Sequence, residues 1–168
     1  MNDRPPNAGL LEFRFAGESD LPAIMALVNQ AFQVERFFLL RDRLDESDVR
    51  EYFDKGRFLL AEQDGALAGS VYVELRGDRA YLGLLSVDPA LQKTGLGRRL
   101  VGAAEEFARE MGSHHMDLTV VNLRIELPPF YQKLGYRTLG AEPIPERMAA
   151  RVSQPCHFIR MSKPLGGA

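Results

Sequence analysis

The segment from Leu82 to Met111 constrains the fold more than any other part of the chain. It begins as an apolar run, breaks at Asp88–Pro89, passes through the sequence QKTGLG and continues as an amphipathic pattern that stops at Gly112. This order predicts a strand, a glycine loop and a helix in direct succession. Because glycine turns tightly without a Cβ atom, the amide hydrogens of residues 93–98 can converge on one anion. The segment therefore predicts an anion cradle at the start of a helix.

The pattern after the glycine loop predicts a helix whose positive N-terminal end points at the loop. Lys93, Arg98 and Arg99 add full charges near that end. A glycine pair after a strand also serves as an ordinary tight turn, so the loop alone does not decide between the two interpretations. The residues expected on the apolar face of the helix are Leu100, Ala104, Phe107, Ala108 and Met111.

Two common phosphate motifs are absent. The chain has no G-x-x-x-x-G-K-[ST], so it lacks the lysine and the magnesium-binding hydroxyl of a P-loop. A dinucleotide fingerprint needs a third glycine where Leu100 stands, and it belongs near the start of a βαβ unit rather than past the middle of a chain. Nucleotide binding of either kind is therefore not expected.

A different pattern does fit this segment. Gln92, Gly95 and Gly97 form Gln-x-x-Gly-x-Gly directly after a strand that ends at Asp88–Pro89. This resembles the coenzyme A pyrophosphate loop of the GNAT superfamily of N-acetyltransferases. The order of predicted elements resembles that superfamily along about residues 10–165, so the likeness covers nearly the whole chain.

A second motif lies downstream. The strand MDLTVV is followed by Asn122 and then by RIELPPFYQKLGY, which predicts a short helix ending at Gly135. The pair Phe130–Tyr131 before Leu-Gly-Tyr resembles the segment in which many superfamily members carry their general acid, and the resemblance gives that role to Tyr131. Asn122 and Tyr131 are nine residues apart, wider than in many members, and Pro128–Pro129 delays the helix start. Phe130–Tyr131 also has a plainer interpretation, as core aromatics on a short helix.

The resemblance implies how acetyl-CoA would be held. In the superfamily the strand before the glycine loop splays from its neighbour, and its free backbone groups hold the pantetheine arm. By resemblance, the amide of Val87 donates to the thioester oxygen. The implied binding residues for acetyl-CoA are Leu85, Ser86, Val87, Gln92, Lys93, Thr94, Gly95, Leu96, Gly97, Arg98, Asn122 and Tyr131.

The general base and the acceptor are less defined. Residues 80–87 contain no carboxylate, so a base on the strand before the loop is missing. Glu74 could act through water, although a glutamate at a strand end is more often solvated. The resemblance points to the link between the first two helices for acceptor binding, here Glu35, Phe37 and Phe38, and the two phenylalanines could equally belong to the core.

Metal chemistry is not expected. His114 and His115 have no partner at metal-ligand spacing. Adjacent Cys156 and His157 cannot face each other on a strand, so a Cys/His nucleophile pair is not expected either. The single cysteine permits no internal disulfide, which agrees with a cytoplasmic location. A formal net charge of −2 gives no electrostatic case for nucleic acid or a membrane surface, and no apolar run is long enough to span a membrane. The sequence leaves open whether the chain forms a homodimer.

Length and patterning predict one α+β domain over residues 10–165 after a disordered tail at residues 1–9. With 168 residues and 45% apolar content, the chain can bury one sizeable core. The resemblance to the GNAT superfamily implies a mixed, mostly antiparallel sheet of about seven strands, flanked by about four helices and splayed between the two strands that bracket the cofactor helix. The predicted elements are strands at 10–16, 58–62, 66–75, 80–87, 116–121 and 157–163, a strand after Gly135, a helix capped by Ser19 or Asp20, helices from Ser47 to Gly56, after Gly97 and before Gly135, and a loop at 140–155.

The sequence thus predicts an acetyl-CoA-dependent N-acetyltransferase that transfers acetyl directly to a primary amine of a small molecule or peptide. One alternative is a non-catalytic module that binds or senses acyl-CoA. Another is an acyltransferase that uses longer acyl groups or hydroxyl acceptors. The sequence does not name the amine.

Overall fold

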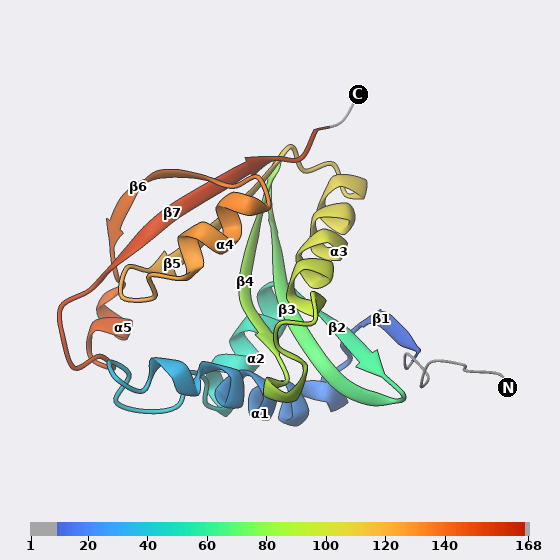
Figure 1. The fold of residues 1–168 in the computed structure, drawn as a ribbon, viewed down its shortest axis with the longest axis horizontal. Coiled ribbons are helices and arrows are strands. Elements are labelled where there is room, and N and C mark those ends of the chain that lie inside the picture. The colour runs from blue at the N-terminus through green and yellow to red at the C-terminus, as the bar shows by residue number, and fades with distance from the viewer. Residues whose placement is uncertain (1–9, 167–168) are drawn as a thin grey trace, which may run out of the picture.

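A seven-stranded sheet organises the chain, as Figure 1 shows. The computed structural model describes residues 10–166, so the tail predicted at residues 1–9 lies outside the described residues. The strands lie in the order β1-β2-β3-β4-β5-β7-β6, and every neighbouring pair is antiparallel except β4 and β5. This confirms the predicted mixed, mostly antiparallel sheet. The strands are β1 Leu11–Phe15, β2 Arg57–Gln63, β3 Ala66–Arg76, β4 Arg79–Val87, β5 His115–Val121, β6 Arg137–Pro143 and β7 His157–Pro164.

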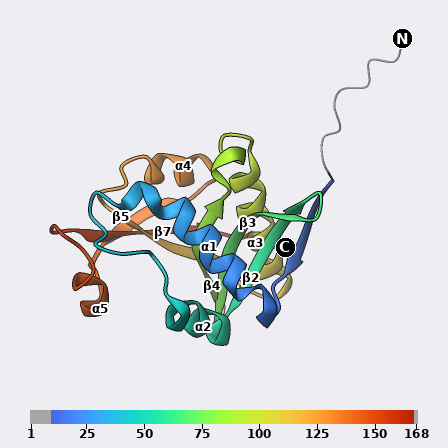
Figure 2. The same ribbon diagram turned by 90° about the horizontal axis from the view of Figure 1, so that it is seen from below.

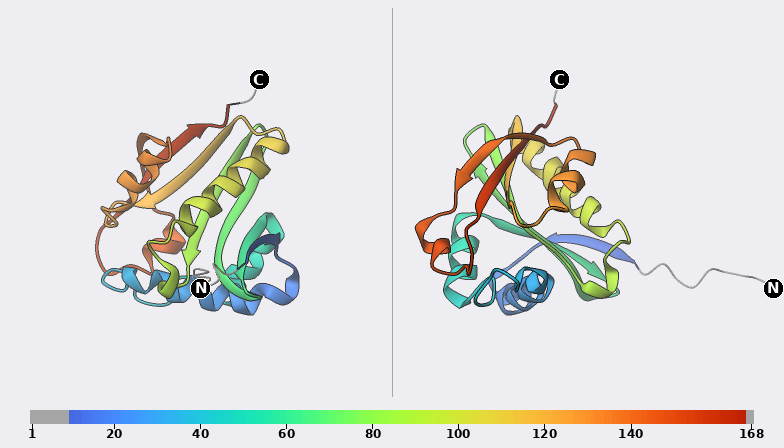
Figure 3. Two further views of the ribbon diagram at one scale, coloured as in Figure 1. Left: turned by 45° about the vertical axis from the view of Figure 1, so that its right-hand side comes forward. Right: turned by 60° about the vertical axis from the view of Figure 1, so that its left-hand side comes forward.

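Helices cover both faces of the sheet, and Figures 2 and 3 show the two layers from different sides. On one face, α3 packs on β2, β3 and β4 around buried Leu100, Ala104 and Met116. On the other, α1 and α2 enclose a separate cluster around Ile24, Val28 and Phe58. α1, α2 and α3 each bury apolar side chains on one face against the sheet, which is the arrangement that stabilises an amphipathic helix in a domain. The helices are α1 Leu21–Ala31, α2 Glu46–Lys55, α3 Leu96–Glu110, α4 Leu127–Lys133 and the short α5 Glu146–Ala149.

Local signals place most element boundaries. Asp64 and Gly65 both have positive φ, 53° and 79°, which confirms the two-residue hairpin between β2 and β3. α2 starts at Glu46, one residue before the prediction, because Asp45 accepts from the backbone N–H of Asp48 at 2.8 Å as a cap. In the part of the chain that the structure describes, no helix is both long and apolar enough to cross a membrane.

Three local predictions are wrong. The stretch from residue 140 to 155 is not a loop throughout, because β6 continues to Pro143, α5 follows, and Val152 forms a bridge to Leu39. The side chain of Asp20 does not cap α1, because it binds the Gly17 amide and Arg14 instead. Met111 lies beyond the end of α3 and is 57% exposed, so it does not belong to the apolar face of the helix.

The sheet opens between β4 and β5. These parallel strands pair only from Arg79 to Tyr81 on β4 and from His115 to Asp117 on β5. Beyond that point the strands diverge, and Figure 1 shows the gap widening toward the C-terminal end of β4. The splay between the strands that bracket α3 is therefore confirmed, and it leaves backbone groups of β4 without a strand partner.

Candidate active site

A β-bulge in β4 directs the side chains that border the open gap. Ser70 pairs with Ser86 and Tyr72 pairs with Gly83, so Val71 faces both Leu84 and Leu85. Leu84 has φ of 51° in this bulge. A bulge shifts the alternation of a strand by one residue. Leu82 belongs to the α3-side core, whereas Leu84 turns to the α1 side and Leu85 returns to the α3 side.

The backbone beyond the bulge offers hydrogen-bond donors to the gap. Asp88 donates its N–H to Ala68 of β3 at 2.8 Å. Because backbone groups alternate in direction along a strand, the N–H of Val87 points away from β3, into the gap. The donor that the sequence assigned to an oxyanion therefore has no strand neighbour to occupy it.

The glycine loop ends at the N-terminus of α3. Gly95, with φ of 86°, caps the helix in the left-handed region, and Lys93 adopts the same region with φ of 65°. The first intrahelical bond runs from Arg99 N to Gly95 O at 3.1 Å, so the amides of residues 96–98 precede it. Such amides, together with the helix dipole, favour a bound anion.

The space above this loop fits a phosphate-bearing arm. A Cβ on Gly97 would lie 3.8 Å from Leu85 Cδ2 and Val87 Cγ2 and 3.9 Å from Phe130 Cζ, so the helix start, β4 and α4 share one lined space. Lys93 and Arg98 line it without an acidic partner among residues 10–166. The residues present therefore fit a pyrophosphate that continues into an apolar arm.

Tyr131 lies where the gap meets α4. Its side chain is 6% exposed and lines the cleft, with its ring edge-to-face against Phe130 at 5.0 Å and Tyr136 at 5.6 Å. Burial raises the pKa of Tyr131 well above the ordinary value for tyrosine. The hydroxyl therefore stays protonated at neutral pH and can act as a proton donor.

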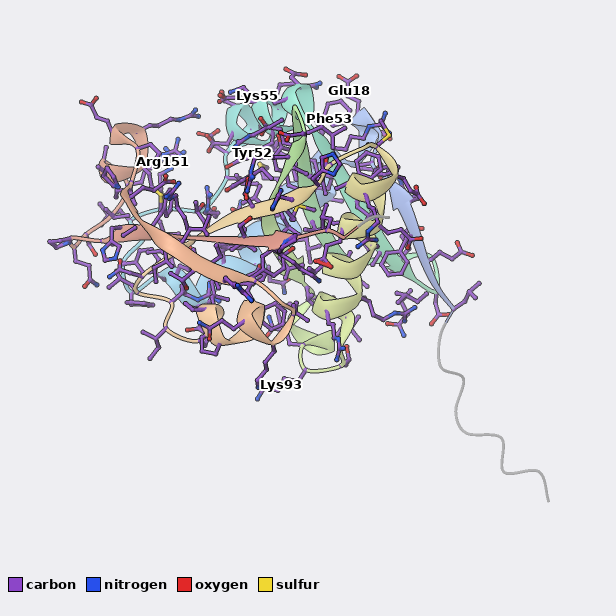
Figure 4. All side chains as sticks on the ribbon, turned by 90° about the horizontal axis from the view of Figure 1, so that it is seen from above. Glu18, Tyr52, Phe53, Lys55, Lys93 and Arg151 are labelled. Atoms are coloured by element: carbon purple, nitrogen blue, oxygen red, sulfur yellow. The ribbon has the colours of Figure 1, made fainter. Side chains whose placement is uncertain are left out.

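One continuous cleft of about 1020 Å³ runs through the opening between β4 and β5. Figure 4 shows Lys93 on the opposite side of the sheet from Tyr52 and Lys55 of α2. We name the two ends by their lining. The glycine-loop half is lined by Leu85, Val87, Leu91, Gln92, Lys93, Gly95, Gly97, Arg98, Leu127, Phe130 and Tyr131. The charged half is lined by Glu35, Asp42, Arg43, Asp48, Glu51, Tyr52, Lys55, Tyr72, Glu74, Arg76, Tyr81, Arg124, Glu126, Arg147 and Arg151.

Glu35 is the most deeply buried acid of the charged half. It is 3% exposed, and its Oε1 accepts from Nη1 of Arg124 at 3.1 Å. Burial raises the pKa of Glu35, and this effect outweighs the opposing charges of Arg124 and Arg43. Arg124 also bonds Glu126 at the start of α4, as a brace of the helix start would do.

Glu74 has a different environment. Burial alone would raise the pKa of Glu74, but hydrogen bonds from Arg76 and from the Tyr72 hydroxyl outweigh it and lower the pKa. The Tyr72 hydroxyl lies 3.0 Å from Oε2 of Glu74. Both oxygens of Glu74 are thus occupied, which makes this carboxylate a weak proton acceptor.

Ion pairs from distant parts of the sequence close the charged half. Asp48 of α2 binds Arg147 of α5 at 2.5 Å and Arg151 after it at 3.0 Å, and Glu51 also binds Arg147 at 2.8 Å. These contacts fix the segment between β6 and β7 against α2. Figure 4 places Arg151 near α5, at the end of the sheet away from β1.

The predicted site residues divide into three groups. Those that line the cleft are Leu85, Val87, Gln92, Lys93, Gly95, Gly97, Arg98, Tyr131, Glu35 and Glu74. Those that support it without lining it are Ser86, whose hydroxyl donates to Leu84 O, Thr94, whose hydroxyl donates to Leu91 O, and Leu96, which is the first residue of α3 and is buried in the core. Asn122 accepts from the backbone N–H of His157 at 2.8 Å and is not among the lining residues, so its role toward a ligand stays a prediction.

The two predicted aromatic acceptor residues lie outside the cleft lining. Phe38 is fully buried beside Leu39 and Val121, and Phe37 is 56% exposed with its ring against that of Phe38. The core interpretation is therefore the better one for Phe38.

Sequence reasoning missed several residues of the charged half. Arg43 and Tyr81 carried no motif, and Asp48, Arg147 and Arg151 meet only through tertiary contacts. Residues 140–155 hold only two arginines, Arg147 and Arg151, so the local sequence carries no signal for this cluster. Within residues 10–166, no three His, Cys, Asp or Glu side chains lie close enough together to hold a metal ion.

The mixed sheet, its splay between β4 and β5 and the glycine loop at the N-terminus of α3 define a class of α+β domains with an anion cradle beside an open strand edge. Residues 29–149 match the family described as acetyltransferase (GNAT) domain, and the chain belongs to this family.

Curated relatives carry acetyltransferase names. The chain is 30% identical to the mycothiol acetyltransferase of Clavibacter michiganensis over 84% of this chain and 47% of that protein. It is 30% identical to the streptothricin acetyltransferase of Streptomyces lavendulae over 66% of this chain and 59% of that protein. The chain thus spans about half the length of the curated relatives it matches.

Solved structures share the fold. The ribosomal-protein-S18-alanine N-acetyltransferase of Escherichia coli superposes with a TM-score of 0.77 at 20% identity, over 95% of this chain and 96% of that one. The yncA acetyltransferase of Salmonella typhimurium, solved with acetyl-CoA, superposes with a TM-score of 0.72 at 21% identity, over 95% and 96% of the two chains.

Proposed function

We propose that this protein transfers the acetyl group of acetyl-CoA directly to the primary amine of a small molecule or peptide. The observation that carries the proposal is the continuous cleft, in which a free strand edge and a buried tyrosine lie between an anion cradle and a charged half. Family membership supports the same reaction class.

The glycine-loop half would hold the donor. The amides of residues 96–98 and the charges of Lys93 and Arg98 bind its phosphates, and Leu85 and Val87 border its arm. Acetyl-CoA, when bound, supplies an activated acetyl carbonyl and a thiolate leaving group. The Val87 N–H is placed to donate to an oxygen in the gap, because it has no strand partner there.

Two side chains would handle the protons. The Tyr131 hydroxyl holds a proton at the edge of the gap and donates it to the leaving sulfur. Glu35 lines the charged half, and its raised pKa makes it a better proton acceptor for the amine than Glu74, which Arg76 and Tyr72 occupy. In this scheme the nitrogen–carbon bond forms as the carbon–sulfur bond breaks, with one proton leaving the amine and one reaching sulfur.

Location and assembly are further proposals. We place the protein in the cytoplasm because its single cysteine fits a reducing compartment. Whether two copies associate stays open to a measurement of mass in solution.

The test of the transfer is Tyr131→Phe. We expect turnover to fall by about 10²-fold or more, because the variant lacks the proton donor, with acetyl-CoA affinity nearly unchanged. Release of coenzyme A thiol reports turnover, and calorimetry reports affinity. Tyr136→Phe is the matched control, because the Tyr136 hydroxyl bonds Glu105 at 3.0 Å instead of lining the cleft.

The outcomes separate an enzyme from a binding module. Equal turnover in parent and Tyr131→Phe contradicts the role of the tyrosine. Tight acetyl-CoA binding without thiol release for any amine favours the non-catalytic alternative.

A further inference from the structure

The charged half contains one cation that no acid neutralises among residues 10–166. Five other cations in this half each meet a carboxylate at 2.5–3.1 Å: Lys55, Arg76, Arg124, Arg147 and Arg151. Arg43 lines the same half, and no ion pair or side-chain hydrogen bond joins it to another described residue. The acids of this half are all paired as well, so the positive charge of Arg43 is left for a ligand.

The backbone beside Arg43 is held in place. Leu44 is buried, and Asn29 of α1 binds both its N–H, at 2.8 Å, and its C=O, at 2.9 Å. The guanidinium carbon of Arg43 lies 5.9 Å from the centre of the Phe32 ring. The side chain is thus fixed at its root and steadied by an aromatic neighbour rather than free in solvent.

Arg43 also lines the same half of the cleft as Glu35 and Tyr81. Its charge acts on Glu35 and on buried Tyr81, and it lowers the pKa of each against the larger effect of burial. Glu35 in turn binds Arg124, whose charge reaches Tyr131. Because Arg43 and Glu35 line the same half of one cleft, a ligand anion on Arg43 would share that half with the proposed proton acceptor.

We propose that Arg43 binds a carboxylate of the acceptor, so that the acceptor is an amine with a carboxylate on the same small molecule, as in an amino acid. The inference rests on the proposed function, because it assigns the substrate class of that same cleft. A guanidinium presents two parallel N–H donors that match a carboxylate. A phosphate monoester would bring close to two charges to a half that has one unpaired cation, so a carboxylate is the better complement.

The experiment uses reaction products as probes, because they need no turnover. Calorimetry would measure binding of N-acetylglycine, N-acetylmethionine, N-acetylglutamate and N-acetylphenylalanine, each against its carboxamide, to the protein saturated with coenzyme A. We expect at least one acid to bind about 10- to 100-fold more tightly than its carboxamide, as a charge-assisted pair predicts. Arg43→Gln should abolish that preference and keep coenzyme A affinity.

Arg50→Gln is the matched control. Arg50 also lies 5.9 Å from a phenylalanine ring, that of Phe53, but it pairs with Glu18 outside the cleft. This variant should keep the preference. If Arg43→Gln does not fold, Arg43→Lys, which keeps the charge but loses the fork, should weaken the preference several-fold.

The outcomes are distinct. The proposal is overturned if no acid binds more tightly than its carboxamide, or if the preference survives in Arg43→Gln or is undiminished in Arg43→Lys. Thiol release from acetyl-CoA with the corresponding free amino acids and amino amides tests the transfer separately. If neither set releases thiol while an Arg43-dependent preference persists, the reaction fails and the carboxylate site stands.

Discussion

The two halves of the cleft are built by different means. The glycine-loop half is assembled mostly from neighbours in sequence, since the end of β4, the loop and the first turn of α3 lie within residues 85–98 and only α4 adds lining residues from elsewhere, and it offers amides and unpaired cations. The charged half is assembled from side chains up to 103 positions apart, such as Asp48 and Arg151, and nearly all of its charges are paired.

This difference has a functional consequence. A half made of backbone amides recognises a phosphate group, which every coenzyme A thioester carries, and it tolerates few substitutions of its glycines. In a half made of paired side chains, acidic and basic residues can be substituted one at a time, so the substrate specificity can change while the fold remains. The predictions below test whether acetyl-CoA binding depends on the glycine-loop half and acceptor chemistry on the charged half.

Replacing Gly95 and Gly97 should have the largest effect. Gly95→Ala with Gly97→Val puts a side chain at φ of 86° and fills the space beside Leu85 and Val87, so the amides can no longer close on an anion. We expect acetyl-CoA affinity to fall by more than about 100-fold, because several charge-assisted bonds are lost together. Calorimetry of the folded variant measures this. Gly102→Ala, in open space within α3, should bind like the parent, and micromolar binding by the double variant would contradict the cradle.

Glu35→Gln should remove the proposed proton acceptor without changing the binding of acetyl-CoA. We expect turnover to fall by about 10²-fold at unchanged acetyl-CoA affinity. The base works only when ionised, and burial raises the pKa of Glu35. In a profile of turnover against pH, the fall on the acid side should therefore lie above the ordinary pKa range of glutamate, and it should vanish in the variant. Glu74→Gln is the control. The pKa of Glu74 is lowered, so this carboxylate stays ionised and should contribute nothing to the fall in turnover on the acid side of the profile. A larger loss in Glu74→Gln than in Glu35→Gln would reverse the assignment.

Asp48→Asn should weaken the ion pairs that close the charged half and leave the glycine-loop half unchanged. Hydrogen bonds from the Asp45 N–H and from Arg151 outweigh burial and lower the pKa of Asp48. A lowered pKa stabilises the fold above the unfolded pKa of aspartate, and that stability is lost as pH falls through the folded value. We expect the variant to lose about 1–3 kcal/mol of unfolding free energy at pH 7 and progressively less toward pH 2. Chemical denaturation measures this unfolding free energy. Glu18→Gln, which removes one partner of the exposed Arg50–Glu18 ion pair, is the control and should change it by less than about 0.5 kcal/mol. A pH-independent difference would mean that ionisation of Asp48 is not the cause.

The sequence predicts the glycine-loop half well because its information is local. Gly95 and Gly97, the strand before them and the apolar stripe after them follow one another, so spacing predicts the loop and the helix, while the binding of an anion there stays a prediction. The bulge at Leu84 lies beyond such reasoning. Strict alternation would put Leu84 on the same face as Leu82, and only the pairing of β4 with β3 reverses it.

The charged half resists prediction for the opposite reason. Nothing in the local sequence of Arg147 or Arg151 indicates that Asp48 will be their partner, since burial of Asp48 depends on α2 packing. The same holds for Glu35, whose raised pKa arises from a tertiary environment. Proline and charge in residues 140–155 predicted a loop, and the segment instead carries α5 and a bridge to Leu39.

Asn122 directly follows β5, is not among the residues that line the cleft, and should show the smallest effect. The resemblance gives this residue a role in binding acetyl-CoA, whereas its Oδ1 accepts from His157 N, and its own N–H donates to His157 O at 2.9 Å. A side chain engaged in joining β5 to β7 should contribute stability rather than donor affinity. We therefore expect Asn122→Ala to lose about 1 kcal/mol of unfolding free energy and to keep acetyl-CoA affinity within about twofold. Affinity reduced tenfold with unchanged stability would instead show that the donor recruits this amide, and the glycine-loop half would then extend past β5.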